Sequence, residues 1–297
     1  MQQIVPTLWF DDRIEEAMEF YTSVFPDSRI VHTSHYPAEG LPDSQQHLAG
    51  RPQVIHFTLF EQHFTALNGG SDVFSPTPAN SFFVGFDTGR DPQARERLDR
   101  LWAALLDGGQ VLIPLDTYPF SEHYGWVQDR YGYSWQLMLG NPEGDWRPII
   151  VPSLMFSDSV QNRATEALEH YTQVFPNSRP GLMVPYTEQS GPARPGALMY
   201  GDAKLADTWF AAMDSAVEQD FTFTPAVSYS VLCEDQEEID QLWSKLSEVP
   251  EAEACGWCQD RFGVSWQIVP ANIEQLLQRP GAYQNMLQMK KLVIDEF

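Results

Sequence analysis

The sequence predicts an α+β fold built from two related halves, and three observations support this prediction. The segment GWVQDRYGYSWQL, residues 125–137, returns in the second half as GWCQDRFGVSWQI, residues 256–268. Each copy has the composition of a strand, a tight turn at Asp-x-x-Gly and a second strand, because Asp can bond its own backbone and Gly accepts a positive φ. Each half also opens with an apolar strand, and the segment that follows has apolar residues at the spacing of an amphipathic helix. Helices on one face of mostly antiparallel sheets give an α+β architecture.

The first unit of each half is a strand followed by a helix. Residues 6–10 read as a strand, and in residues 13–25 the apolar side chains recur at steps of three and four, as in Ala17, Met18 and Tyr21. Pro26 ends this helix. Residues 152–156 and 164–175 repeat the arrangement, so the two halves begin alike.

The remaining segments complete the repeat. Strand pairs are expected at 54–60 with 64–70 and at 197–200 with 208–214, and new strands at 81–86 and 227–232 lead into helices at 92–106 and 236–246. Each half therefore reads as strand, helix and three strands, taken twice. We predict domains over residues 1–142 and 149–270, a linker near 140–145, and a tail over 271–297 that is helical around 271–277 and 283–291.

Composition narrows the class of partner. The chain has 297 residues, a net charge of −23 and 13% aromatic residues, so contact with nucleic acid or an anionic membrane is not expected. No apolar run is long enough to span a bilayer and no secretion signal is apparent. The three cysteines, all in the second half, do not form a disulfide framework. We expect a cytoplasmic protein.

Several motifs resemble one known family. They are FYTSVF at 20–25, ALNGG at 66–70, EEIDQLW at 237–243 and the two hairpins. With these the chain is similar to two tandem PhnB-like domains of the vicinal-oxygen-chelate, or glyoxalase/bleomycin-resistance, superfamily. The resemblance implies two βαβββ modules per domain, forming a cupped mixed sheet that holds a small ligand. It also implies an internal pseudo-dimer, and leaves open a homodimer of the whole chain.

The resemblance also bears on metal and cofactor binding. Metal-dependent relatives often end the closing hairpin in a carboxylate, and here that position holds Gln136 and Gln267. A neutral amide is a weaker ligand for a divalent cation than a carboxylate or an imidazole. We therefore predict no metal of the usual kind. Such proteins are often labelled 3-demethylubiquinone 3-methyltransferases, but no glycine-rich strand-to-helix turn for a nucleotide-like cofactor is present, and no cofactor is expected.

Six residues are candidates for ligand binding. Strand alternation places Gln136 on the face opposite Trp135, so that its amide either binds a ligand in the cup or bonds neighbouring groups. Gln267 has the same two interpretations. His56 lies mid-strand, where a satisfied core histidine is the simpler interpretation. The remaining candidates are two aromatic side chains that could stack on a planar ligand and one residue at the end of a module: Trp9, Trp209 and Asn68.

Two classes of function follow. The first is a metal-free protein that binds an apolar or aromatic small molecule in a β-cup. The alternative is a glyoxalase- or dioxygenase-type enzyme with a non-standard metal site, so that whether the protein is an enzyme, and with which catalytic residues, stays open. A third interpretation is structural, in which one half only completes the other's interface.

Overall fold

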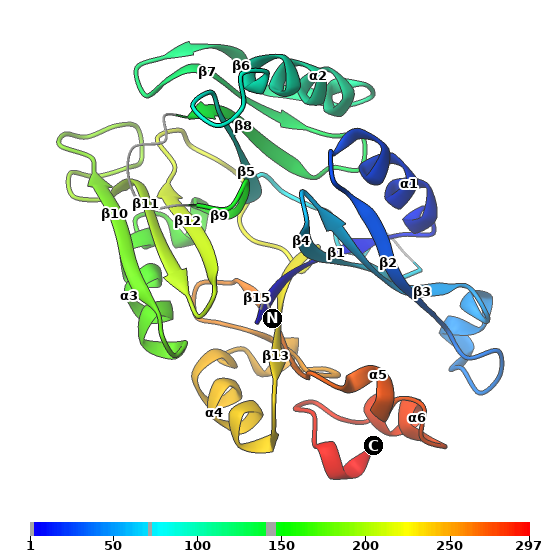
Figure 1. Ribbon diagram of the computed structural model, residues 1–297. Coiled ribbons are helices and arrows are strands. Elements are labelled where there is room, and N and C mark those ends of the chain that lie inside the picture. Colours follow the sequence, from blue (N-terminus) through cyan, green and yellow to red (C-terminus); the bar gives the residue numbers. More distant parts are fainter. Residues whose placement is uncertain (1–2, 71–72, 141–146) are drawn as a thin grey trace.

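The computed structural model describes residues 3–70, 73–140 and 147–297, and Figure 1 shows their arrangement. The predicted linker around 140–145 therefore lies almost wholly outside the described residues. In the first half, module one consists of β1 (Ile4–Phe10), α1 (Ile14–Val24), β2 (Arg29–His35), β3 (Pro52–Leu59) and β4 (Gln62–Asn68), with a 3-10 turn at Asp43–Leu48. Module two consists of β5 (Asn80–Asp87), α2 (Ala94–Leu106), β6 (Gln110–Tyr118), β7 (Ser121–Gln128) and β8 (Ser134–Gly140).

The second half follows the same order. Its module one consists of β9 (Ile150–Phe156), α3 (Ala164–Val174), β10 (Arg179–Pro185), β11 (Leu198–Leu205) and β12 (Thr208–Asp214), and its module two of β13 (Val227–Cys233), α4 (Gln236–Leu246), β14 (Trp257–Gln259) and β15 (Ser265–Pro270). Short 3-10 turns lie at Asp158–Val160, Pro250–Ala252 and Ile294–Glu296. The tail contributes α5 (Ile273–Leu276) and α6 (Ala282–Met286).

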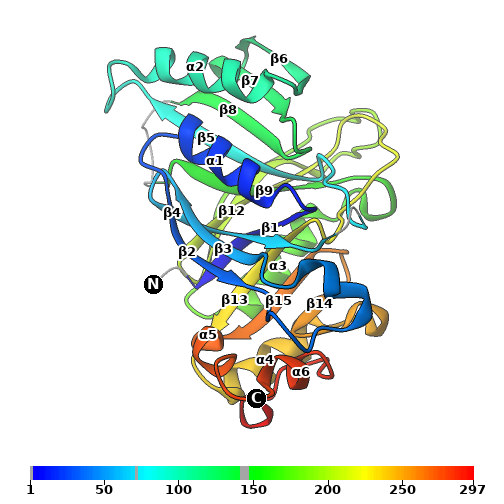
Figure 2. The ribbon, with the colours of Figure 1, turned by 90° about the vertical axis from the view of Figure 1, so that its right-hand side faces the viewer.

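Each of the two sheets contains strands from both halves. The first sheet has the order β14-β15-β13-β1-β4-β3-β2, and the second has the order β10-β11-β12-β9-β5-β8-β7-β6. The halves meet where β1 pairs antiparallel with β13 and where β5 pairs antiparallel with β9. The predicted α+β fold of paired βαβββ modules is confirmed, and each sheet joins one module of one half to one module of the other (Figures 1 and 2). The predicted division at 1–142 and 149–270 stays a prediction.

One helix from each half covers the outer face of each sheet. Helices α1 and α4 pack on the first sheet, and α2 and α3 pack on the second. The hydrophobic core joins the two modules of each half. In the first half, Trp135 of β8 packs against Phe25 at the end of α1, with ring centroids 4.8 Å apart. Trp266 and Phe175 repeat this contact at 5.2 Å. Each half is thus fastened internally by aromatic packing and to the other half by β-pairing.

The repeated hairpin holds a buried carboxylate that explains its sequence. Asp129 Oδ1 accepts bonds from the backbone amides of Tyr131 (2.9 Å) and Tyr133 (3.0 Å). Its Oδ2 accepts bonds from Tyr21 Oη (2.7 Å) and Trp135 Nε1 (2.8 Å). The turn glycine has the expected positive φ, 90° at Gly132. The Asp-x-x-Gly motif therefore sets the turn, as the sequence predicts, and also ties the hairpin to α1.

The second copy of this network is complete. Asp260 accepts bonds from Phe262 N, Val264 N, Tyr171 Oη and Trp266 Nε1, at distances between 2.7 and 3.1 Å. Burial raises the pKa of Asp260 to about 6, although these hydrogen bonds act in the opposite direction. Burial also raises the pKa of Asp129. The two carboxyls are structural anchors on the helix side of the sheets.

Two sequence predictions are wrong in extent. Module two of the second half has only two strands after α4, because the segment between α4 and β14 forms the 3-10 turn Pro250–Ala252 where the first half has β6. In the tail, α6 ends at Met286 rather than near 291. The backbone carbonyls of Met289 and Lys290 instead accept bonds from Cys255 N (2.8 Å) and Gly256 N (2.7 Å). Residues 289 and 290 therefore hydrogen-bond to the backbone of the repeated hairpin instead of continuing the helix. None of the helices in the described ranges is long and apolar enough to cross a membrane.

Candidate functional site

The inner face of each sheet, opposite its helices, carries a row of polar side chains. On β8, Trp135 and Leu137 belong to the helix-side core, so Ser134 and Gln136 point to the other side. Strand register then aligns Ser134 of β8, Ser81 of β5 and Ser153 of β9 on the inner face of the second sheet. The equivalent row of the first sheet consists of Ser265 of β15, Ser228 of β13 and Thr7 of β1.

Polar groups of the first inner face bond one another. Thr7 Oγ1 lies 2.8 Å from Ser230 Oγ, and Gln267 Nε2 donates to Ser228 Oγ at 2.8 Å. His56 Nδ1 lies 3.1 Å from Thr65 Oγ1. Burial lowers the pKa of His56, and the neighbouring histidines add to this, whereas Glu274 opposes it. Thr7 and Ser228 of this row are therefore hydrogen-bonded to neighbouring side chains.

The second inner face is partly bonded in the same way. Gln136 accepts a bond from Tyr124 Oη at 2.6 Å and donates one to Ser81 Oγ at 2.8 Å. Both ends of this amide therefore have a protein partner. Burial raises the pKa of Tyr124, so at neutral pH its hydroxyl keeps the proton that it donates.

Three buried polar atoms of the second inner face differ from those of Gln136 in their hydrogen bonding. Within residues 3–70, 73–140 and 147–297, Trp126 Nε1, Ser134 Oγ and Ser153 Oγ have no hydrogen-bond partner. We call these three atoms the polar trio. The other buried atoms of this kind, on Thr58, His170 and Thr222, are scattered over β3, α3 and the segment before β13.

A single replacement explains why Ser153 differs from its counterpart Thr7. Thr7 bonds Ser230, two residues along β13 from Ser228. The equivalent position on β5, two residues from Ser81, is Phe83. A phenyl ring offers no hydrogen bond, so the partner that Thr7 has in the first sheet is not provided for Ser153.

Each inner face also meets a charged side chain from the segment that follows its last parallel strand. Beyond β15, Glu274 of α5 lies 3.1 Å from His56 Nε2. Beyond β8, Arg147 Nε lies 2.9 Å from Asp202 Oδ2, and its guanidinium stacks 3.5 Å from the Trp209 ring centre. His56 and Asp202 occupy equivalent positions, since each is paired across its sheet with the neighbour of Thr7 or Ser153.

The six sequence-predicted residues do not gather in one place. Trp9, His56 and Gln267 belong to the first inner face, where the Trp9 ring is edge-on to Trp257 at 6.2 Å. Gln136 and Trp209 belong to the second. Asn68 is on neither, because its amide bonds Pro52 O at 2.9 Å and accepts from Gly70 N at 3.0 Å. These bonds hold Asn68 against Pro52 and Gly70, and its role in ligand binding stays a prediction.

Several residues of the site are not among those six. Ser134, Ser153 and Trp126 are ordinary strand residues in the sequence, and the repeat alone could have drawn attention to the first two, because serine or threonine recurs at both copies. Arg147 and Glu274 lie outside the repeated strands. Strand pairing and tertiary contacts, rather than neighbouring sequence, bring these side chains to the inner faces.

The amides that end the two repeated hairpins are poor metal ligands. In the described part of the chain no group of three or more His, Cys, Asp or Glu side chains is placed to hold a metal ion. Gln136 and Gln267, the positions where the resemblance to metal-dependent relatives implies a ligand, donate hydrogen bonds to Ser81 and Ser228. Divalent cations prefer imidazole, thiolate and carboxylate to such amides.

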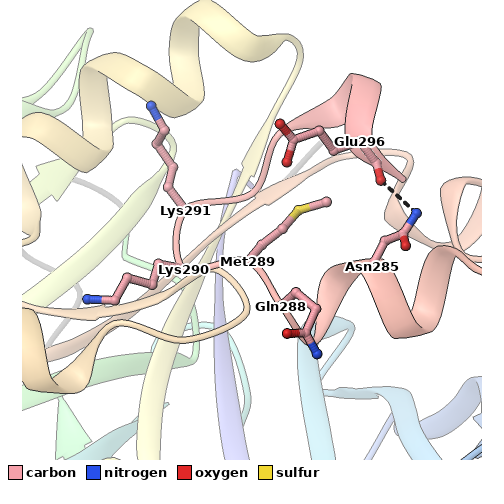
Figure 3. Close-up of a pocket in the computed structure, with 6 residues that line it drawn as sticks. All are labelled: Asn285, Gln288, Met289, Lys290, Lys291 and Glu296. Atoms are coloured by element: carbon pink, nitrogen blue, oxygen red, sulfur yellow. Dashed lines mark hydrogen bonds between the residues drawn. The ribbon is translucent and has the colours of Figure 1, made fainter.

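A surface pocket of about 630 Å³ is lined by residues of the tail, none of which belongs to the polar rows of the inner faces. Its lining residues are Asn285, Gln288, Met289, Lys290, Lys291 and Glu296. Figure 3 shows the two lysine side chains directed away from Met289 and Asn285. Lys290 Nζ bonds Glu253 at 3.0 Å and Lys291 Nζ pairs with Asp240. These cations fasten the tail to the second half, so the pocket is a weaker candidate than the inner faces.

Comparison with known proteins identifies the family. The model of the family described as 3-demethylubiquinone-9 3-methyltransferase matches residues 2–138 and again residues 148–269. A Bacillus cereus structure described as a 3-demethylubiquinone-9 3-methyltransferase, PhnB protein, is 38% identical, covers 47% of this chain and 100% of its own, and has a TM-score of 0.40. A search of curated protein sequences finds no match.

The fold has solved counterparts of full length. Glyoxalase I from Zea mays is 10% identical, with 96% of this chain and 94% of that chain covered at a TM-score of 0.54. The likeness is in the fold alone at this identity. With both halves matched by one family model, the chain belongs to the family described as 3-demethylubiquinone-9 3-methyltransferase, and its fold is similar to that of glyoxalase I.

Proposed function

We propose that this protein binds a small molecule on the inner face of the second sheet, without a metal. The polar trio is the observation that carries the proposal. An unbonded buried polar atom costs on the order of 1–3 kcal/mol, and three such atoms on one face of one sheet point to a ligand that bonds them.

The chemistry of the face defines the ligand. Trp126 Nε1 can only donate a hydrogen bond, so the ligand presents an acceptor oxygen or nitrogen there. The serine hydroxyls can donate or accept. Around them lie Val151, Trp209 and Ala211, with Phe83 and Tyr200 packed against these. Such a surface suits a compound with an apolar or aromatic body and a few polar atoms.

The enzymatic alternative requires a metal at an unusual set of ligands. Gln136, the residue at the family's ligand position, already accepts a bond from Tyr124 and donates one to Ser81. Its contacts are those of a positioning residue for Ser81. They give the alternative no support, and binding is the function that the geometry favours.

A binding assay with purified protein tests the proposal. A panel of flat aromatic ketones and phenols is screened for compounds that raise the melting temperature, because a ligand that binds only the native state stabilises it. The double variant Ser134→Ala/Ser153→Ala should weaken the affinity of each such compound about tenfold, from the loss of two hydrogen bonds. Protein dialysed against EDTA should bind as before.

The matched control removes a hydroxyl from the first sheet instead. Thr7→Ala should leave the affinity unchanged. The proposal fails if no compound stabilises the protein, if the double variant binds as tightly as the wild type, or if removal of metal ions abolishes binding.

A further inference from the structure

An aromatic cluster lies at the tip of the β6–β7 hairpin. The rings of Tyr118 and Phe120 are stacked with centroids 5.8 Å apart, and Tyr124 meets Phe120 edge-on at 5.0 Å and Tyr118 at 5.6 Å. Tyr124 is buried, but Phe120 is 65% exposed. Covering this exposed ring with a ligand would bury apolar surface and so favour binding.

This cluster adjoins the polar groups of the second inner face. The Tyr124 hydroxyl donates a hydrogen bond to Gln136, which in turn donates one to Ser81, a member of the row Ser134, Ser81 and Ser153. Trp126 of the polar trio follows two residues later on β7, opposite Gln136, so that Tyr124 and Trp126 share the inner face about 7 Å apart. The exposed ring is therefore continuous with the site.

The cluster belongs to one sheet only. Across residues 147–297 the structure has no strand equivalent to β6, and Cys255 stands where the first half has Tyr124. Figure 1 shows the second sheet curving between the β6–β7 hairpin at one end and β10–β11 at the other. The hairpin thus adds aromatic surface to the sheet that carries the polar trio and adds none to the first sheet.

We infer that Tyr118, Phe120 and Tyr124 form an aromatic clamp for a flat ring of the ligand. The inference rests on the proposed function and adds a ligand class to it. The ligand has a terminal aromatic ring that packs against Phe120, and an acceptor atom on the side of Trp126 that accepts a hydrogen bond from Trp126 Nε1. Edge-to-face and offset-stacked ring pairs supply a preference for aromatic over saturated rings.

A pair of matched probes tests the clamp. 4-Phenylphenol and 4-cyclohexylphenol share the phenol and differ only in whether the distal ring is aromatic. Their affinities are measured by isothermal titration for the wild type, for Phe120→Ser, and for Val111→Ser as a control. Val111 is another exposed apolar residue, 45% accessible, at the opposite end of β6.

The clamp predicts a change in the ratio of the two affinities. Phe120→Ser should weaken 4-phenylphenol about fivefold, the effect of losing one aromatic pair, and should change 4-cyclohexylphenol much less. Val111→Ser should match the wild type. The clamp is overturned if Phe120→Ser leaves both affinities unchanged, if it lowers both equally, or if neither probe binds. Loss of probe binding in Ser134→Ala/Ser153→Ala, with no effect of Phe120→Ser, would retain the proposed function and reject the clamp.

Discussion

Ser153 and Thr7 occupy equivalent positions on the inner faces of the second and first sheets, yet their hydroxyls differ in hydrogen bonding. Thr7 lies 2.8 Å from Ser230, whereas Ser153, 0% exposed, has Phe83 at the position equivalent to Ser230 and has no hydrogen-bond partner in the described ranges. The first inner face therefore has a closed polar pair, and the second has a serine and a phenylalanine at the equivalent positions. This divergence makes the two inner faces chemically distinct within one symmetric framework.

Alanine substitutions at these two positions should have opposite effects on stability. Ser153→Ala removes a buried hydroxyl that lacks a partner within residues 3–70, 73–140 and 147–297, so the free energy of unfolding should stay constant or rise by about 1 kcal/mol. Thr7→Ala leaves Ser230 without its bond and should lower it by about 1–2 kcal/mol. Urea denaturation of both variants measures this difference. An equal loss in the two variants would contradict the assignment of Ser153 to ligand binding.

The hairpin carboxylates give a second prediction. Tyr21 and Tyr171 each donate to a buried aspartate at 2.7 Å. A hydrogen bond to a charged group contributes about 1.5–3 kcal/mol, so Tyr21→Phe and Tyr171→Phe should each lower the free energy of unfolding by about 2 kcal/mol at pH 7.5. Tyr36→Phe is the control, because Tyr36 donates to a neutral carbonyl, Asn68 O, at 2.6 Å, and should cost about 1 kcal/mol. Identical losses in all three variants would show that the charge of the acceptor has no influence.

Asp260 should make stability depend on pH. Its folded pKa of about 6 exceeds the ordinary value of 3.8, so between these values the folded protein holds a proton that the unfolded chain releases. The stability from this group is therefore present below about pH 4 and is lost as the pH rises through 6, by about 3 kcal/mol in all.

A non-titrating variant isolates this contribution from the protein's other carboxyls. The difference in unfolding free energy between the wild type and Asp260→Asn should grow by about 2 kcal/mol in favour of the wild type as the pH falls from 7 to 4. NMR titration of Asp260 near pH 6 gives an independent check. A difference that is constant over this range would mean that Asp260 titrates at its ordinary pKa.

The features that could be predicted from the sequence are those that depend on residues close together in the chain. The Asp129-to-Gly132 turn could be recognised because an aspartate that bonds its own backbone and a glycine with positive φ act within a few residues. The stripe on α1 was equally local, with Tyr21 facing the core. The same local rules failed in the tail, where helical periodicity suggested a longer α6 and pairing with Cys255 and Gly256 ended it.

The candidate site could not be predicted because it depends on pairing between distant strands. Ser134, Ser81 and Ser153 form one row only because β5 pairs with β8 on one side and with β9 of the other half on the other. Hydrophobic periodicity shows which face of a strand a residue occupies, but it does not show which strand lies beside it. Arg147 was missed for the same reason, since nothing near it in the sequence indicates Trp209 as its partner.

The two charged pairs on the inner faces should differ in strength although their positions correspond. Arg147 contacts Asp202, whose side chain is 6% exposed, whereas Glu274 and His56 are 47% and 37% exposed. Removing one partner of a buried pair leaves an uncompensated charge, so Arg147→Ala should lower the free energy of unfolding by about 3 kcal/mol. Glu274→Ala should cost less than about 1 kcal/mol, as exposed ion pairs do. Urea denaturation of the two variants measures both losses.

The double variant Arg147→Ala/Asp202→Asn distinguishes lost charge pairing from lost stacking on Trp209. If the buried carboxylate causes the loss, the double variant should be more stable than Arg147→Ala alone, because it has no unpaired charge at position 202. The amide oxygen introduced there can still accept the bond that Leu182 N donates to Asp202 Oδ1 at 2.7 Å. A double variant no more stable than the single one would assign the effect to the guanidinium–indole contact instead.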